Sequence, residues 1–97
     1  MRSKAYETAL AGGAHAAWMR ELEKLGVHQL VAARRSILRQ IDAHWRWLEN
    51  PSSKVCDWSQ RDPRYRDGLQ RKWQQDIRRQ TEQVEIITAI LRLRGHD

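Results

Sequence analysis

Hydrophobic residues in the middle of the chain recur at alternating gaps of four and three positions. The positions that follow this spacing are Val27, Val31, Arg34, Leu38, Ile41, Trp45 and Leu48. Such a heptad pattern is typical of a helix that presents one apolar seam to a neighbouring helix, and Leu30, Ile37 and His44 lie beside the seam and widen it. A residue that precedes proline is pushed out of the α region, so Pro51 ends the segment and we predict one long helix over residues 27–50.

The same spacing returns in the last third of the chain. It runs through Trp73, Ile77, Gln80, Val84, Ile87 and Leu91, with a second apolar row at Ile86, Ile90 and Leu93. Asp62 followed by Pro63 is a strong helix start, because the carboxylate accepts free backbone N–H groups and the first turn does not need the donor that proline lacks. We therefore predict a helix over residues 63–94, with a start shortly after Gly68 as the alternative.

The first 25 residues also follow a helical pattern. Ala11, Trp18, Leu22 and Leu25 lie on one side of it. Gly26 is well placed to end this helix, but Gly12 and Gly13 each weaken a helix by about 1 kcal/mol. We predict a helix over residues 3–25 whose N-terminal half frays or kinks, and a polar connector over residues 51–62.

Together these elements predict a fold without strands. Two long helices of matched length and period pack well as an antiparallel hairpin. The expected fold class is all-α, a three-helix bundle built on a long antiparallel helical hairpin, with residues 1–97 as a single helical domain. A chain of this length leaves apolar surface uncovered, so a partner or an oligomer would stabilise it.

Two polar residues interrupt the apolar seams. Buried polar groups at such positions lower stability while fixing the register or the oligomeric state. Arg34 either plays this part or extends its guanidinium to solvent at the end of the bundle. For Gln80 we predict a hydrogen bond across the helix pair.

The net charge of +6 is concentrated in the middle of the chain. Residues 34–79 carry twelve basic and six acidic side chains, whereas residues 1–33 carry four and three and residues 80–97 carry two and three. A positive field attracts phosphates, anionic membranes and acidic protein faces without choosing among them, and pairs such as Asp42 with Arg46 neutralise part of it. The candidate residues for an anion or nucleic-acid site are Arg35, Arg39, Arg46, Arg64, Arg66, Arg71 and Arg78.

The five tryptophans divide by position. Trp18, Trp45 and Trp73 lie on the predicted apolar stripes, so we expect them in the core. Trp47 points to a different face from Trp45, and Trp58 either closes the open end of the bundle or projects as an anchor. Tryptophans exposed beside arginines are typical of protein-interface hot spots and can also stack on unpaired bases. The candidate residues for a protein interface are Trp47, Trp58, Ile86, Ile90 and Leu93.

The sequence offers little for catalysis or metal binding. The four histidines lack the spacing of a zinc site, and Cys56 has only Asp57 as a titratable neighbour, which raises a thiol pKa. We find no serine nucleophile motif, phosphate-binding loop or paired carboxylates, so we predict no enzyme activity and no cofactor. A single cysteine favours a reducing compartment, and no run of residues is apolar and long enough to cross a bilayer; we expect a cytoplasmic protein with no membrane partner.

These observations favour a small, non-enzymatic interaction module. We expect it to act through protein–protein contacts, with self-association or binding to another protein, as a regulatory, adaptor or assembly protein of bacterial, phage or mobile-element origin. The alternative is a basic nucleic-acid-binding protein that contacts phosphates through its arginine-rich central region. That alternative lacks a zinc finger, a basic zipper or an RNA-binding aromatic motif.

Overall fold

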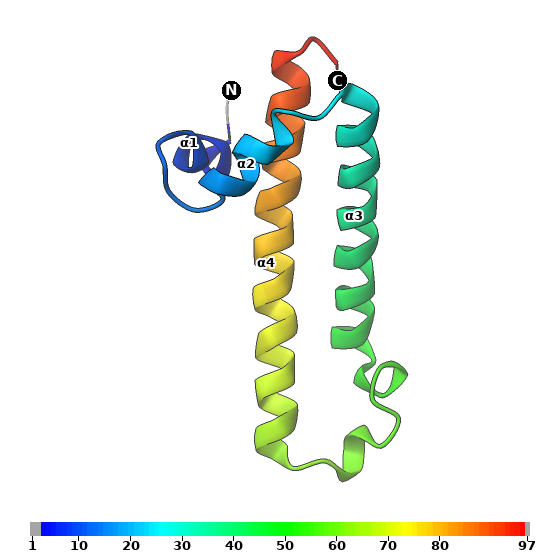
Figure 1. The fold of residues 1–97 in the computed structure, drawn as a ribbon. Coiled ribbons are helices and arrows are strands. Elements are labelled where there is room, and N and C mark those ends of the chain that lie inside the picture. The colour runs from blue at the N-terminus through cyan, green and yellow to red at the C-terminus, as the bar shows by residue number, and fades with distance from the viewer. Residues whose placement is uncertain (1–2, 97) are drawn as a thin grey trace.

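The protein is all-helical over residues 3–96, the part of the chain that the computed structural model describes. In chain order the elements are α1 (Lys4–Leu10), α2 (Ala16–Leu22), α3 (Val27–Glu49), the 3-10 turns η1 (Pro51–Ser53) and η2 (Trp58–Gln60), and α4 (Pro63–Leu93). Helices α3 and α4 lie side by side and antiparallel over most of their length, as Figure 1 shows. The all-α class and the long helix pair are confirmed, and residues 1, 2 and 97 of the predicted domain lie outside the described residues.

The ends of the two long helices follow the local signals in the sequence. Helix α3 stops at Glu49, just before the predicted boundary. Helix α4 starts at Pro63, and a carboxylate oxygen of Asp62 accepts a hydrogen bond from the backbone N–H of Arg64 at 2.7 Å. The cap thus satisfies one of the free donors of the first turn, and the segment between the helices holds only the two 3-10 turns.

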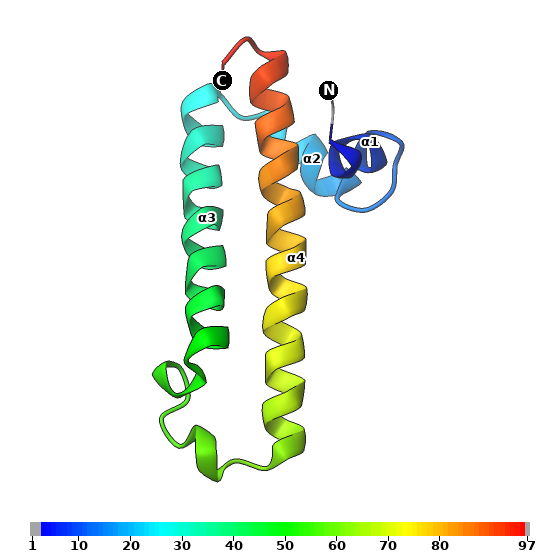
Figure 2. The ribbon, with the colours of Figure 1, turned by 180° about the vertical axis from the view of Figure 1, so that it is seen from behind.

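The predicted single helix over residues 3–25 is wrong. The chain instead forms α1 and α2, with a break between them at residues 11–15. Gly12 has a φ of +91° and His15 a φ of +69°, and this left-handed backbone cannot continue a right-handed helix. Helices α1 and α2 lie against α4 on the side away from α3 (Figures 1 and 2).

The main core surrounds the C-terminal half of α4, with α1 and α2 on one side of it and the N-terminal half of α3 on the other. Its most deeply buried members are Tyr6, Ala9, Met19, Leu22, Leu30, Ile86, Ile87, Ala89, Ile90 and Leu91. Full burial of a leucine or isoleucine side chain stabilises a fold by about 1.5–3 kcal/mol, so this cluster is the principal source of hydrophobic stability. It occupies one end of a molecule 50 Å long.

Polar contacts tie the first helices to α4. His15 lies 3.2 Å from a carboxylate oxygen of Glu82. At the end of α4, Arg94 donates hydrogen bonds to the carbonyl oxygens of Leu25 and Glu23, the second at 2.9 Å. One arginine therefore holds the turn between α2 and α3 against the last turn of α4.

Helix α3 faces α4 with only part of the predicted seam: Arg34 of the seam contacts Thr88 of α4, whereas Leu38 and Trp45 of the seam are turned away. The row at Leu30, Ile37 and His44 points to α4: Leu30 is fully buried, and His44 lies 3.4 Å from Asp76 of α4. Leu38 and Trp45 come one residue later in each case, about 100° further round the helix, and are 48% and 51% exposed. The prediction that Trp45 lies in the core is therefore wrong.

Candidate interaction surface

A tryptophan cluster, defined as Trp47, Trp58 and Trp73, fills the end of the helix pair next to the connector. Trp73 is buried, as predicted; its ring stacks on that of Trp58 at 5.8 Å between centroids and lies 5.7 Å from that of Trp47. The ammonium of Lys54 lies 4.5 Å above the Trp47 ring, where a cation is attracted by the π face. Trp47 and Trp58 are therefore half-buried against their own chain, and Trp58 closes the open end of the pair.

Beside the tryptophan cluster, Asp76 is a buried carboxylate with three cationic or potentially cationic neighbours. Lys72 and Arg79 donate to it at 3.2 and 3.1 Å, and His44 approaches it from α3. Burial by itself raises the pKa of Asp76, but the hydrogen bond from Lys72 and the charges of Lys72, Arg79 and His44 outweigh it, so the pKa lies below its ordinary value. The carboxylate is thus held ionised at neutral pH and links the two long helices.

Two further polar contacts cross the helix pair. Gln80 is buried and donates from Nε2 to Oε1 of Gln40 at 3.0 Å, which confirms the predicted cross-helix hydrogen bond. Arg34 donates to the hydroxyl of Thr88 at 3.1 Å and is half-buried. Each bond pairs positions at one height on the two helices and so favours one register.

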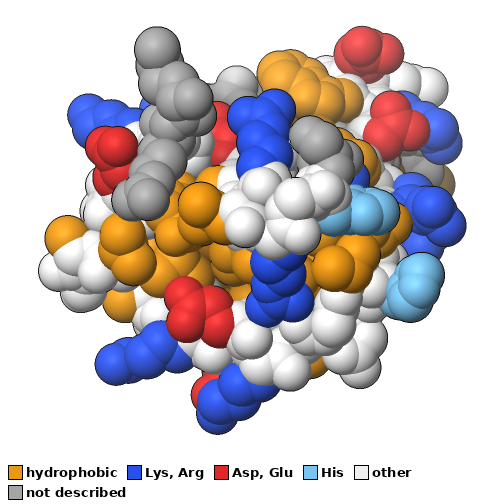
Figure 3. Space-filling model, turned by 90° about the horizontal axis from the view of Figure 1, so that it is seen from above, with side chains coloured by type: hydrophobic (Ala, Val, Ile, Leu, Met, Phe, Trp, Pro, Cys, Tyr) orange, Lys and Arg blue, Asp and Glu red, His pale blue; other side chains and the backbone are white. Residues whose placement is uncertain are grey.

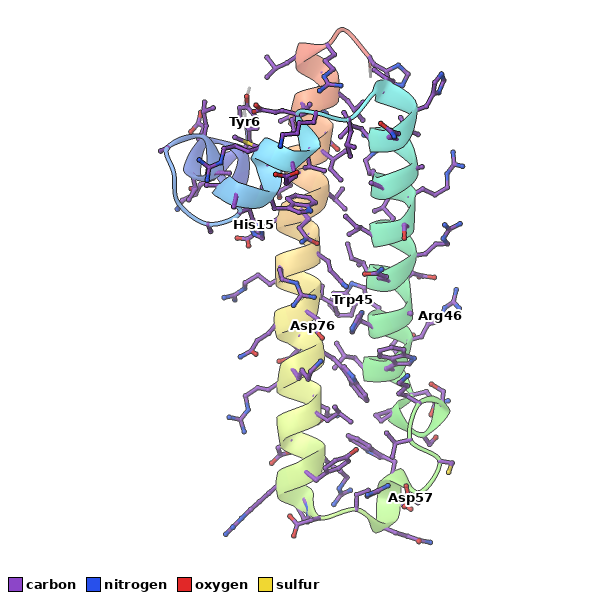
Figure 4. All side chains as sticks on the ribbon, viewed as in Figure 1. Tyr6, His15, Trp45, Arg46, Asp57 and Asp76 are labelled. Atoms are coloured by element: carbon purple, nitrogen blue, oxygen red, sulfur yellow. The ribbon has the colours of Figure 1, made fainter. Side chains whose placement is uncertain are left out.

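The largest apolar surface without a cover on α3 is a row that we call the outer stripe, defined as Val31, Leu38 and Trp45. Residues seven apart differ by only about 20° around a helix, so the three side chains stay on one side of α3. Val31 is half-buried against the core, whereas about half of Leu38 and of Trp45 is open to solvent. Figure 4 shows Trp45 in its place on α3, with Arg46 extending from the side away from α4.

A row of ionisable side chains, the flank, borders the outer stripe on the side away from α4. It consists of His28, Arg35, Asp42 and Glu49, all exposed and spaced by seven residues. Its N-terminal half is basic and its C-terminal half is acidic. Asp42 also pairs with Arg46 at 2.5 Å, as predicted, and Arg35 has no ion-pair partner among residues 3–96.

The other predicted interface residues lie at the opposite end of α4. Ile86 and Ile90 are buried among core residues and contact their own chain. Leu93 is 58% exposed in the last turn of α4. Seen from this end, the surface has apolar side chains across its middle with charged side chains around them (Figure 3).

The seven candidate arginines do not gather on one face. Arg35, Arg39 and Arg46 are exposed on the side of α3 that points away from α4. On α4, Arg64, Arg71 and Arg78 are spaced by seven residues, on the side that points away from α3. The two rows therefore face in opposite directions across the helix pair.

Arg66 lies apart from the other arginines. It points to a different side of α4 and is partly buried, and its Nε atom has no hydrogen-bond partner among the described residues.

A surface hollow of about 490 Å³ lies between α1 and α4. Lys4, His15, Arg78, Glu82 and Glu85 line it, so cations and carboxylates neutralise one another there. Within residues 3–96 no group of three or more His, Cys, Asp or Glu side chains is placed to hold a metal ion. None of the described helices is long and apolar enough to span a membrane.

Sequence reasoning missed Leu38 and Trp45 as surface residues. The signal that could have found them is the presence of two adjacent apolar rows on α3, at 30/37/44 and at 31/38/45. A single partner helix covers only part of so wide a face.

No protein-family model matches the chain, and no match is found among the curated proteins or among the solved structures.

Proposed function

We propose that this protein is a small, non-enzymatic helical module that acts through protein–protein contacts made by the outer stripe of α3. The observation that carries the proposal is the exposure of Trp45, 51% open to solvent next to Leu38 at 48%. Regulatory, adaptor and assembly proteins of bacteria or phages work in this way, and a cytoplasmic location agrees with the single exposed thiol of Cys56.

The exposure matters because the chain packs its other tryptophans. Trp73 is buried, and Trp18, Trp47 and Trp58 are half-buried against other parts of the fold. A large aromatic side chain left open on a helix is a common anchor of an interface, since tryptophan is enriched among residues that dominate binding energy. Covering Trp45 and Leu38 would remove apolar surface from water, which is favourable in proportion to the area buried.

The shape of the fold supports the proposal further. At the end that holds the main core, we propose that α1 and α2 together take the place of the third helix of a bundle. At the other end the described residues form a pair of α-helices, and the only other segment beside α3 is the connector with its 3-10 turns. A two-helix hairpin leaves apolar surface open on both sides of the pair, and a further helix would complete the bundle there.

The alternative function, phosphate binding by the arginines, has less support. A groove that follows a nucleic-acid backbone needs cations on one face, whereas the arginine rows of α3 and α4 point in opposite directions. Part of the charge is also used within the chain, by Arg46 with Asp42 and by Arg79 with Asp76.

The test is site-specific photocrosslinking in the cells that naturally make the protein. A photoreactive phenylalanine analogue replaces Trp45 in one variant and the exposed Gln75 of α4 in the control. We expect a crosslink to protein from position 45 and none from position 75. The proposal is contradicted if position 45 gives no protein product, or if its product is a nucleic acid.

A further inference from the structure

We infer that the outer stripe of α3 is covered by a second copy of the same chain, with the two α3 helices antiparallel and a two-fold axis at the level of Leu38. The inference rests on the proposed function, because it names the occupant of the same surface. It follows from how the apolar and charged residues of α3 are distributed about its midpoint.

The apolar residues of the outer stripe are symmetric about Leu38. Val31 lies seven residues before it and Trp45 seven residues after it. In an antiparallel pair centred on Leu38, each Trp45 is therefore level with Val31 of the other copy, and the two Leu38 side chains meet at the axis. A large side chain thus opposes a small one at each outer layer, which is the arrangement that allows helices to interdigitate.

The flank is complementary to itself in the same arrangement. Arg35 lies three residues before Leu38 and Asp42 four residues after it, so with a rise of about 1.5 Å per residue they come within about 1.5 Å of the same level on opposite copies. His28 and Glu49 are ten and eleven residues from Leu38 and also become level. Every position of the basic half then faces a position of the acidic half.

A parallel pair of the same helices would not have this match. In that arrangement the two-fold axis runs along the helices, so the flanks of the two copies lie on opposite sides of the contact and Arg35 does not reach Asp42 of the other copy. The flank also argues against a uniformly acidic partner, because such a partner would repel Asp42 and Glu49. The occupant that fits both halves is α3 itself.

Two features of the fold leave room for this contact. Helices α1 and α2 lie on the far side of α4, so they do not cover the outer stripe (Figures 1 and 2). Asp42 is 60% exposed even with its contact to Arg46, so it can accept a second cation. A contact between two helices of this length is at the small end of stable interfaces, near 1,200 Å² in total, so we expect dimerisation in the micromolar range.

The first experiment is sedimentation equilibrium of the purified full chain in reducing buffer. We expect a monomer–dimer equilibrium that Trp45→Ala weakens about 30-fold or more, the loss typical of an interface hot spot, and that Leu38→Glu abolishes. Circular dichroism should show both variants as helical as the wild type, since each side chain is half-exposed in the monomer. A chain that stays monomeric at hundreds of micromolar, or a dimer that both substitutions leave unchanged, overturns the inference.

A charge exchange then tests the orientation. Arg35→Glu and Asp42→Lys should each weaken the dimer, and the double variant should recover most of the loss because the opposite charges meet again. Arg39→Glu is the matched control: it makes the same charge change on an exposed residue further from the stripe, and should have little effect. Failure of the double variant to recover any affinity contradicts the antiparallel pairing.

Crosslinking with a short bismaleimide completes the test, in a Cys56→Ser background because Cys56 is exposed. An equal mixture of Arg35→Cys and Asp42→Cys chains should give mixed dimers, and each variant alone should give few. Mixed dimers no more frequent than the dimers of either variant alone would contradict the antiparallel pairing.

The two proposals fail in different ways. If the purified chain is monomeric and position 45 still crosslinks to another protein in cells, the inference of a second copy is wrong and the proposed function as an interaction module stands. If the probe at position 45 crosslinks to no protein, both the inference and the proposed function are contradicted.

Discussion

Two tryptophan-to-alanine substitutions should differ greatly in their effect on stability, although the sequence places both residues on apolar stripes. Trp73 is 3% exposed, with the rings of Trp47 and Trp58 against it. Trp45 is 51% exposed on the other long helix. The pair therefore isolates burial as the only large difference between the two changes.

The magnitude follows from the volume that each substitution empties. Replacing a buried tryptophan by alanine destabilises a protein by about 3–5 kcal/mol, because the transfer free energy and a cavity term add. For a chain of this size, 1 kcal/mol corresponds to about 5 °C in Tm, so Trp73→Ala should lower Tm by about 15–25 °C. Trp45→Ala leaves no cavity, and at a concentration where the chain is monomeric it should change the free energy of unfolding by about 0.5 kcal/mol or less.

Thermal unfolding followed by circular dichroism, together with urea titration, measures both variants. Dilute samples are needed, since a dimer interface that contains Trp45 would make Tm depend on protein concentration. Equal losses for the two variants under dilute conditions would refute the assignment of Trp45 to the surface. A loss below about 1 kcal/mol for Trp73→Ala would refute the packing of the tryptophan cluster, because cavity formation at a buried tryptophan costs more than that.

Three further predictions concern single positions. Asp76→Asn should destabilise the protein by about 1–3 kcal/mol at pH 7, since charge-assisted hydrogen bonds are lost. The pKa of Asp76 is lower in the folded state than its ordinary value, so the ionised carboxylate stabilises the fold when the pH is above that ordinary value, and this stabilisation disappears as the pH falls below about 4. In acid, urea titrations should therefore give the wild type and the variant the same free energy of unfolding. Gln80→Leu should leave stability unchanged or raise it by up to about 1 kcal/mol, because Oε1 of Gln80 is buried without a partner in residues 3–96 and Gln40 is exposed to water. A clear loss in urea titration would show that the cross-helix hydrogen bond contributes more than we infer. Gly12→Ala should destabilise the protein by about 1 kcal/mol because Gly12 has a positive φ. Gly68 lies inside α4 with open space around it, so Gly68→Ala should stabilise the protein by about 0.5–1 kcal/mol. Equal effects of the two substitutions on Tm would contradict the positive φ at Gly12.

The boundaries of the long helices could be predicted from the sequence because local chemistry decides them. Pro51 ends α3 two residues before it, at Glu49, and the Asp62–Pro63 pair starts α4. The all-α class follows from the period of the apolar residues. These signals lie within a few residues of the feature that they determine, so a single sequence is sufficient.

The orientation of α3 could not be predicted, because a distant partner decides it. Rows 30/37/44 and 31/38/45 have the same period and similar composition, and both are compatible with a helix pair. Contacts with α4, above all that of His44 with Asp76, select the first row. The same reason explains why the arginines could not be assigned to faces before the two helices were placed against each other.

The sequence predicts only part of the break in the first helix. The paired glycines predicted a weak point, but a left-handed backbone is uncommon at any residue other than glycine, so that of His15 could not be predicted from its residue type alone. The structure stabilises it from outside, through the contact of His15 with Glu82 of α4. A helix that turns back on itself to reach another element is a tertiary feature that local propensity does not record.

The position of the tryptophan cluster has a consequence for the order of folding. The cluster lies beside the connector, so its side chains come from segments close together in the chain and can meet after a short loop closes. The contacts of Arg94 with Glu23 and Leu25 join positions about 70 residues apart. Closing long loops is slower than closing short ones, so contacts between α3 and α4 should form first beside the connector and then extend toward the other end of the pair. Helices α1 and α2 should dock last, and they should detach first when the protein begins to unfold.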